Sequence, residues 1–382
     1  MFNPDCRVFE ERREIFFKKL NGKAAIIPSS SLVRHHADCE YPFRQDSNFW
    51  YLTGFDEPDS IALFLSHKPK GERFILFVAP KDILSEVWHG FRWGIEGAER
   101  EFKADKAHSI NEFKDLLPVY IGESEEIVYS IGKHTKIEKI VLEIFSQQQE
   151  ARSRVGTGAN SIKSPEIYLN EMRLIKSDFE INRMREATQI SAEAHELVRE
   201  SISSKKNERQ IQGLIEGFFL EKGARGPAYN SIVASGDNAC ILHYTLNNSE
   251  LNNGDLLLVD AGCSLIDYYN GDITRTFPIG GKFSKEQKLI YEIVLEAQKN
   301  AIKNSVKGSN STNVHNVALR ILVEGLKEIG LLRGDTDGII ENGSYKHLYM
   351  HRTGHWLGLD VHDVGAYRMG EYDVPLQNGM IL

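Results

Sequence analysis

Two aspartates in the C-terminal half of the chain have a spacing that could serve metal chemistry. Asp260 ends the apolar run DLLLVD, and Asp272 follows twelve positions later in NGDITRTFP. A carboxylate at the end of a buried strand must be ion-paired, hydrogen-bonded or bound to a cation. If both carboxylates face one side of a hairpin, a divalent cation such as Mn²⁺, Zn²⁺, Co²⁺ or Mg²⁺ is the natural counter-charge. A surface turn with a salt bridge, for example to Arg275, is the alternative interpretation.

Three histidines, His351, His355 and His362, fall within twelve residues in the segment YMHRTGHWLGLDVHDVG. A lone histidine in such a setting is usually a hydrogen-bonded core residue, but three together favour metal binding or catalysis. The segment is not HExxH, because no glutamate follows His351 and Gly354 would interrupt a helix. We therefore expect strand and loop backbone that lines a cleft. His243, in CILHYT, is expected on a further short strand and is a fourth candidate.

The elements that must position these residues begin with a long amphipathic helix. Ser177 and Glu180 form a capping-box pattern, which predicts a helix start near Asp178. A turn over 251–254 separates the later strands from the helices before them. The remaining elements that the pattern predicts are helices over 208–222, 284–304 and 313–329, and paired strands over 255–260 and 277–281.

The first part of the chain, to about residue 170, has a different pattern of apolar residues. The apolar runs 24–28, 61–65 and 74–79 predict buried strands of an α/β domain. The aromatic-rich stretch 41–58 is too irregular for a strand, so we expect a packed loop with a short strand. A change in pattern at 172–177 predicts the domain boundary.

Composition excludes several classes of protein. A chain of 382 residues is long enough for two domains, and a net charge of −8 without a basic block argues against nucleic-acid or anionic-membrane partners. Its four cysteines lack CxxC spacing, so the sequence predicts neither a disulfide framework nor a thiolate zinc site. A reducing, cytoplasmic location fits this usage. The sequence contains no run of eighteen apolar residues, so it predicts neither export nor membrane insertion.

These motifs together resemble the pita-bread metallopeptidases, and among them the Xaa-Pro aminopeptidases (aminopeptidase P). The resemblance covers nearly the whole chain and rests on EYPFRQDSNFWYLTGFDEP, MRLIKSDFEINRMREA, ILHYT, VDAG, GDITRTFP and HWLGLDVHD. It implies an α/β (α+β) fold with an N-terminal aminopeptidase P domain over 1–174. A C-terminal pita-bread catalytic domain is implied over 175–382.

The resemblance also implies an activity and the residues that carry it. The activity is removal of the first residue from peptides with proline in second position, by water activated between two divalent metal ions, usually Mn²⁺. The implied metal ligands are Asp260, Asp272 and His355. The implied residues for substrate binding and proton handling at the scissile carbonyl are His243, His351 and His362. A homo-oligomer, dimer or tetramer, is expected, with Trp88, Phe91 and Trp93 in EVWHGFRWG as a candidate subunit contact or as core.

Two departures from the family pattern affect these expectations. The paired aspartates of the family usually lie one position closer together, so we expect the extra residue in the turn or in a bulge. The family also supplies two glutamate ligands in segments that would follow Leu382. For the chain as given, the sequence therefore predicts weak or single-metal binding and little activity.

Two other functions remain open at this point. Prolidase shares the same ligands but cuts only dipeptides, so a tripeptide assayed against a dipeptide separates it from an aminopeptidase. Non-catalytic pita-bread binding modules and creatinase-like enzymes lack the paired aspartates, so Asp260 and Asp272 argue against both.

Overall fold

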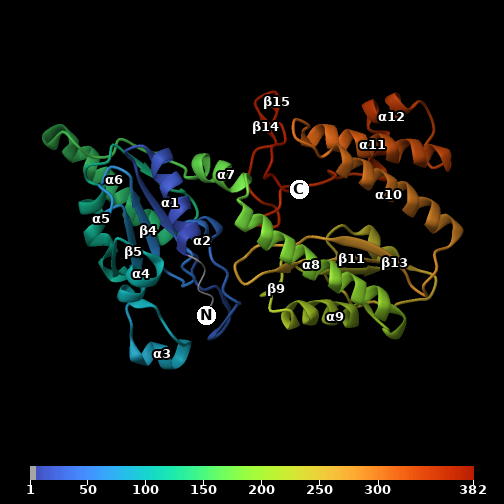
Figure 1. Ribbon diagram of the computed structural model, residues 1–382, viewed down its shortest axis with the longest axis horizontal. Coiled ribbons are helices and arrows are strands. Elements are labelled where there is room, and N and C mark those ends of the chain that lie inside the picture. The colour runs from blue at the N-terminus through green and yellow to red at the C-terminus, as the bar shows by residue number, and fades with distance from the viewer. Residues whose placement is uncertain (1–5) are drawn as a thin grey trace. The chain divides into compact units, whose positions relative to one another are not determined.

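The structure is a computed structural model that describes residues 6–382. The chain forms two compact units, residues 1–170 and 171–382, and the helix α7 (Glu166–Leu174) runs across this division (Figure 1). The division lies four residues before the predicted boundary at 174, and the exact bounds of the domains stay a prediction. Within the described residues, no helix is long and apolar enough to cross a membrane.

Unit 1 is built on a mixed six-stranded sheet with the order β6-β5-β4-β1-β7-β8. Its strands are β1 Ala24–Pro28, β4 Ile61–Leu65, β5 Phe74–Val78, β6 Lys106–Ser109, β7 Glu126–Val128 and β8 Ser161–Lys163. The pairs β1–β4 and β4–β5 are antiparallel, while β1–β7, β5–β6 and β7–β8 are parallel. β1, β4 and β5 are buried along their whole length, which confirms the three strands predicted from continuous apolar runs.

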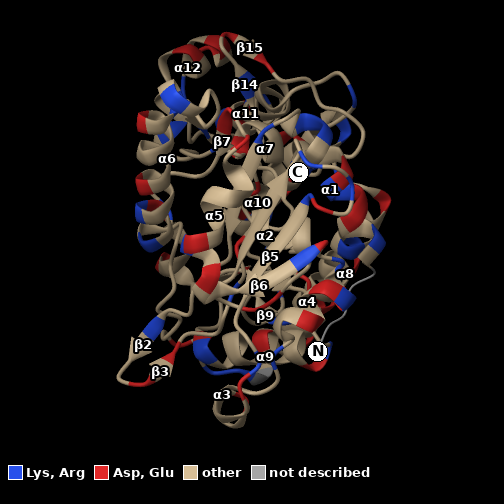
Figure 2. Cartoon of the chain, turned by 90° about the vertical axis from the view of Figure 1, so that its left-hand side faces the viewer, with Lys and Arg blue, Asp and Glu red and all other residues tan. Residues whose placement is uncertain are grey.

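Helices cover both faces of this sheet. Leu117 of α5 and Val141 of α6 pack with Leu63 in one core, and Phe16 of α1 packs edge-on against Phe64 on the opposite face. Acidic and basic residues alternate along the outer side of α6 (Figure 2). The helices are α1 Cys6–Leu20, α2 Ser47–Thr53, α3 Ile83–His89, α4 Gly94–Phe102, α5 Phe113–Ile121 and α6 Thr135–Val155, and a small hairpin pairs β2 Arg34–His36 with β3 Cys39–Glu40.

The prediction of a loop with a short strand over 41–58 is wrong, because this stretch contains α2. The Asp46 side chain accepts hydrogen bonds from the backbone N–H groups of Asn48 and Phe49, both at 2.9 Å, and caps the helix. Gly54 ends it in a left-handed conformation, φ 65°. Residues 49–53 are all buried, so the helix lacks the one-sided apolar stripe that sequence patterns reveal.

Unit 2 contains the predicted long helices. Ser177 caps α8 through the expected capping box with Glu180, so the predicted start near Asp178 is confirmed. α10 and α11 pack together, and Trp356, which follows His355, is buried in the same cluster. The helices are α8 Asp178–Ser201, α9 Glu208–Glu221, α10 Lys285–Asn304, α11 Ser311–Glu328 and α12 Thr336–Asn342. Four short 3₁₀ helices complete the helical elements of residues 6–382: Ile110–Glu112, Ile202–Ser204, Gly236–Cys240 and Ser344–His347.

The sheet of unit 2 places the two aspartates. β11 (Leu256–Asp260) pairs antiparallel with β10 (Ile232–Ser235) and with β13 (Thr274–Pro278). β13 therefore starts and ends three residues earlier than the strand predicted over 277–281. The shorter pairs are β9 Gly226–Pro227 with β12 Cys263–Ser264, and β14 Arg368–Met369 with β15 Tyr372–Asp373.

The β11–β13 hairpin continues without a bulge beyond its named strands. Asp260 lies opposite Thr274, Ser264 opposite Asn270, and the N–H of Leu265 donates to the carbonyl of Tyr269. Opposed residues share a face and faces alternate along a strand, so this register puts Asp260 and Asp272 on one face. Only residues 266–268 remain for the turn, where Tyr268 has φ 70°. The length difference from the family pattern is thus absorbed in the turn.

Candidate metal centre

The two aspartates converge on one hydroxyl group. The Oη atom of Tyr229 contacts Asp260 Oδ1 and lies 2.8 Å from Asp272 Oδ1. Tyr229 follows β9 in the loop ARGPAYN, where the sequence carried no spacing that marks it as functional. Arg275, the alternative salt-bridge partner, instead donates to the backbone carbonyl of Thr274.

Tyr229 has one hydrogen for two carboxylates. A phenolic hydroxyl can donate to only one of them, so the second short contact is favourable when a carboxyl group keeps its own proton. Burial and the neighbouring charge of Asp272 raise the pKa of Asp260, although the hydrogen bond from Tyr229 acts to lower it. Burial and the two carboxylates likewise raise the pKa of Tyr229, so the phenol stays neutral.

His355, more than eighty residues further along the chain, contacts one of the two aspartates. Its Nε2 lies 3.1 Å from Asp272 Oδ2, while its Nδ1 is 3.0 Å from the Trp356 carbonyl and donates to it. This second contact orients the ring, since it fixes which nitrogen faces the carboxylate. The hydrogen bond to Asp272 raises the pKa of His355. For Asp272, burial acts to raise the pKa, but the bonds from His355 and Tyr229 outweigh it and lower the pKa.

His362 lies beside His355, whereas His351 and His243 lie elsewhere. The rings of His355 and His362 are 4.2 Å apart and meet edge to face. His351 is exposed, and its Nδ1 contacts the carbonyl of Arg352. Within the described residues, no hydrogen bond or ring contact joins His243 or His351 to either aspartate.

The predicted strand at His243 is wrong. Residues 241–243 form a bend and a turn, and His243 is exposed on a loop between β10 and β11. Glu208, the first residue of α9, anchors this loop. Its buried carboxylate accepts hydrogen bonds from Ser235, Asn238, Tyr244 and Ser249. An irregular loop with its own polar anchor gives no strand periodicity.

Two buried features hold the aspartate hairpin in place. The His195 ring of α8 donates from Nε2 to the carbonyl of Ala261 at 3.0 Å, directly after Asp260. A Cβ atom at Gly262 would lie 1.8 Å from the Gly271 carbonyl oxygen, so the VDAG motif needs glycine there. Neither residue was singled out from the sequence.

The donor set suits a divalent cation in type. Two carboxylates and an imidazole are donors that Mn²⁺ or Zn²⁺ accepts, and two half-buried acids side by side favour a cation between them. Across residues 6–382, however, no group of three His, Cys, Asp or Glu side chains is already arranged to hold an ion. The carboxylate oxygens of Asp260 and Asp272 contact Tyr229 and His355 instead.

Comparison with known proteins identifies the class. Residues 182–382 match the model of metallopeptidase family M24, and residues 9–129 match that of the aminopeptidase P N-terminal domain. The chain therefore belongs to metallopeptidase family M24. The predicted resemblance and the predicted fold, an N-terminal α/β domain followed by a pita-bread domain, are confirmed.

The individual relatives are Xaa-Pro aminopeptidases. The chain is 43% identical to Xaa-Pro aminopeptidase of Haemophilus influenzae over 98% of this chain and 84% of that protein, and 36% identical to the Escherichia coli enzyme over 98% and 85%. The solved structure of Pseudomonas aeruginosa aminopeptidase PepP matches with a TM-score of 0.94 and 37% identity, covering 100% of this chain and 86% of that one. A zinc-substituted E. coli aminopeptidase P in complex with product matches at 0.93 and 36%, covering 99% and 86%. These findings support the metallo-aminopeptidase expectation over the prolidase and binding-module alternatives.

Proposed function

We propose that this protein releases the N-terminal residue from peptides whose second residue is proline, with two Mn²⁺ ions as cofactors. The observation that carries the proposal is the convergence of Asp260, Asp272 and His355 in a chain of this family. These three residues would hold metal. When bound, divalent metal supplies a Lewis acid that lowers the pKa of water and polarises a carbonyl group.

The remaining roles belong to side chains of the protein. His362 would donate a hydrogen bond to the developing oxyanion or pass a proton to the leaving proline nitrogen, and its ring contact with His355 supports this role. His243 and His351 are proposed to bind substrate and handle protons from the exposed segments that carry them. Tyr229 orients both carboxylates through its single hydroxyl.

The test combines metal binding with cleavage. Calorimetric titration with Mn²⁺ is expected to show binding to the wild-type chain and its loss in Asp260→Asn and Asp272→Asn. With the wild-type protein at saturating Mn²⁺, Xaa-Pro-Xaa tripeptides should be cleaved, slowly because weak metal binding is expected for the chain as given, and matched Xaa-Ala-Xaa tripeptides should not. Each Asn variant should lower cleavage by more than about 100-fold, because loss of outer-shell partners alone typically costs 10- to 100-fold.

Matched controls separate this proposal from its rivals. Asp337→Asn removes an exposed aspartate of α12 that pairs with Arg320, and it should leave metal binding and cleavage unchanged. Cleavage of Xaa-Pro dipeptides but not of tripeptides would favour a prolidase. Wild-type protein that neither binds Mn²⁺ nor cleaves either peptide would contradict the proposal.

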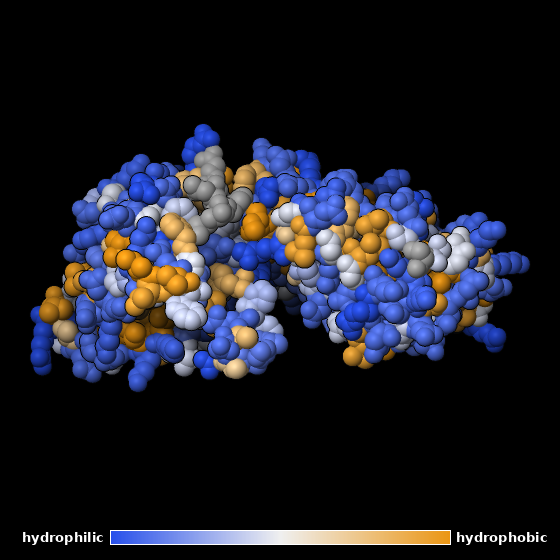
Figure 3. Space-filling view, turned by 90° about the horizontal axis from the view of Figure 1, so that it is seen from below, coloured by the Kyte–Doolittle hydropathy of each residue, from blue (hydrophilic) through white to orange (hydrophobic). Residues whose placement is uncertain are grey.

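We also propose that α3 forms a subunit contact in a homo-oligomer, a dimer or tetramer. None of its residues is buried, and its apolar side chains are 74–82% exposed: Ile83, Leu84, Val87 and Trp88. Hydrophobic residues gather on the face of unit 1 that α3 occupies (Figure 3). Such a patch on a soluble protein favours association. Sedimentation velocity should show a larger species for the wild type than for Val87→Glu/Trp88→Glu, and equal sizes would contradict the contact.

The cytoplasm is the proposed location, and the absence of nucleic-acid and membrane partners belongs to the same proposal. Cys39, Cys240 and Cys263 are not joined in disulfides, which suits a reducing compartment. Cell fractionation with an antibody against the chain would test this placement.

A further inference from the structure

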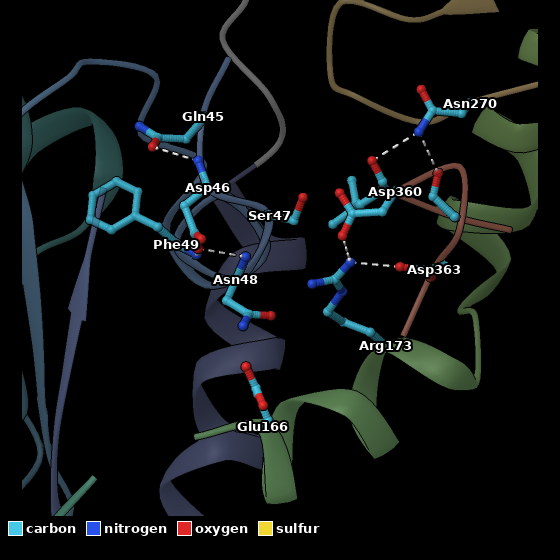
Figure 4. A network of polar contacts seen from close by, with 12 residues as sticks. Gln45, Asp46, Ser47, Asn48, Phe49, Glu166, Arg173, Asn270, Asp360 and Asp363 are labelled. Carbon is cyan, nitrogen blue, oxygen red and sulfur yellow. Dashed lines mark hydrogen bonds and ion pairs between the residues drawn. The ribbon is translucent and has the colours of Figure 1, made fainter. Parts of the chain in front are cut away.

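A buried ionic cluster lies behind the loop that carries His355 and His362. The Asp363 side chain is 1% exposed, and each of its oxygens meets a different cation: Oδ1 is 2.6 Å from Arg173 Nη2, and Oδ2 is 2.9 Å from Lys176 Nζ. Arg173 also reaches Asp360 Oδ2 at 2.7 Å. Figure 4 shows Arg173 between the two aspartates. Charges this deeply buried are costly unless each is paired, so the cluster fixes where its members lie.

Asp363 closes the histidine loop on itself. Its N–H donates to the carbonyl of Trp356 at 2.9 Å, so residues 356–363 form one closed loop that follows His355 and contains His362. A Cβ atom at Gly358 would lie 2.1 Å from Asp363 Oδ2, so the carboxylate fills the centre of this turn. A shift of Asp363 must therefore move the backbone next to His355 and His362.

The same loop is tied to the aspartate hairpin. The buried Asn270 side chain donates from Nδ2 to the carbonyls of Gly358 at 3.1 Å and Leu359 at 2.8 Å (Figure 4). Asn270 precedes Asp272 by two positions. The loop is thus held on one side by cations and on the other by the segment that presents Asp272.

We propose that Arg173, Lys176 and Asp363 are positioning residues, which set the His355 ring against Asp272 and the His362 ring beside His355 through the 356–363 loop. The segment 172–177, where the change in sequence pattern predicts a domain boundary, supplies both cations. The inference rests on the proposed function for the roles of the two histidines.

The test removes one cation and observes the histidine rings. Lys176→Met keeps the length of the side chain but leaves Arg173 alone with two carboxylates. Lys176→Met/Asp360→Asn restores the charge balance, and Lys176→Arg keeps the charge. In NMR spectra of protein with ¹⁵N-labelled histidine, the ring signals of His355 and His362 should shift in both Met variants and stay close to wild type in Lys176→Arg.

Distant histidines and a matched lysine serve as controls. The signals of His108 in unit 1 and His195 in α8 should stay unchanged, which shows that the fold is intact. Lys163→Met removes the exposed partner of Glu126, 2.9 Å away in unit 1, and should move none of these signals. Both Met variants should lower kcat for an Xaa-Pro peptide by about 10- to 100-fold, the usual effect of residues that orient metal ligands.

The outcomes are distinguishable. Unshifted His355 and His362 signals in folded Lys176→Met protein would overturn the inference. Global unfolding of both Met variants would also overturn it, because the charges would then support the whole unit rather than the loop. Shifted signals in a protein whose wild type cleaves no Xaa-Pro peptide would count against the proposed function and leave the positioning role standing.

Discussion

Glu208 offers a sharp test of how the His243 loop is anchored. Its carboxylate is fully buried and accepts five hydrogen bonds. Oε1 accepts from Ser235 N at 2.7 Å, Ser235 Oγ at 2.8 Å and Asn238 Nδ2 at 3.0 Å, and Oε2 accepts from Tyr244 Oη at 2.8 Å and Ser249 N at 2.9 Å. Glu208→Gln keeps the shape and one acceptor but turns the other into an NH₂ group.

The magnitude follows from these contacts. The amide oxygen of glutamine can replace Oε1, so its three donors keep a partner. The hydroxyl of Tyr244 can rotate and accept from the new NH₂ group, but the backbone N–H of Ser249 cannot turn away. One orphaned buried N–H costs about 1–3 kcal/mol, and loss of charge assistance weakens the remaining bonds, so we expect Glu208→Gln to lower the free energy of unfolding by about 2–4 kcal/mol.

Urea denaturation followed by circular dichroism measures this loss. In Glu208→Gln, hydrogen exchange of residues 236–250 should be accelerated relative to wild type more than that of α8, because the anchor of that loop is weakened. Glu221→Gln, at the exposed end of the same helix, is the control and should change the free energy of unfolding by less than about 0.5 kcal/mol. Equal stability of the Glu208 and Glu221 variants would refute the reasoning.

Three further outcomes are expected. For Glu208, burial acts to raise the pKa, but the hydrogen bonds outweigh it and lower the pKa below its ordinary value of 4.5. The ionised carboxylate therefore stabilises the fold above pH 4.5, and this stabilisation is lost as pH falls through the lowered pKa. In urea titrations, the difference in free energy of unfolding between wild type and Glu208→Gln should shrink over that pH range. Gly262→Ala should cost more than about 3 kcal/mol, because its Cβ would clash with the Gly271 carbonyl, whereas Gly213→Ala in α9, with open space, should raise the melting temperature. Ser177→Ala should cost about 1 kcal/mol by thermal unfolding, and no change would contradict the capping box.

Much of the fold was predictable because local chemistry and burial agree. The strands of unit 1 are covered on both faces, so they read as unbroken apolar runs. Ser177 caps α8 with the capping box that the sequence predicts, and the structure has a second such box at Ser284, the start of α10. α2 was missed because aromatic residues are buried around its whole circumference, although Asp46 and Gly54 were signals for its ends.

The candidate site was predictable only where residue type and spacing are informative. Asp260, Asp272 and His355 combine metal-ligand chemistry with strand and loop positions. Tyr229 is one tyrosine among fourteen, and nothing in its neighbours indicates that a hydroxyl must bridge two acids. The pairing of Lys176 with Asp363 joins residues 187 positions apart, and such a contact exists only in the folded chain.

The unbroken register of the β11–β13 hairpin separates its chemistry from the length of its tip. A residue gained or lost among 266–268 alters only the outermost turn, while the opposed pairs below keep their partners. A single insertion lower down, between Asp260 and Ser264 for example, would rotate one acid toward the reverse side of the sheet. Related chains can therefore differ in length at this tip and still bring both acids together.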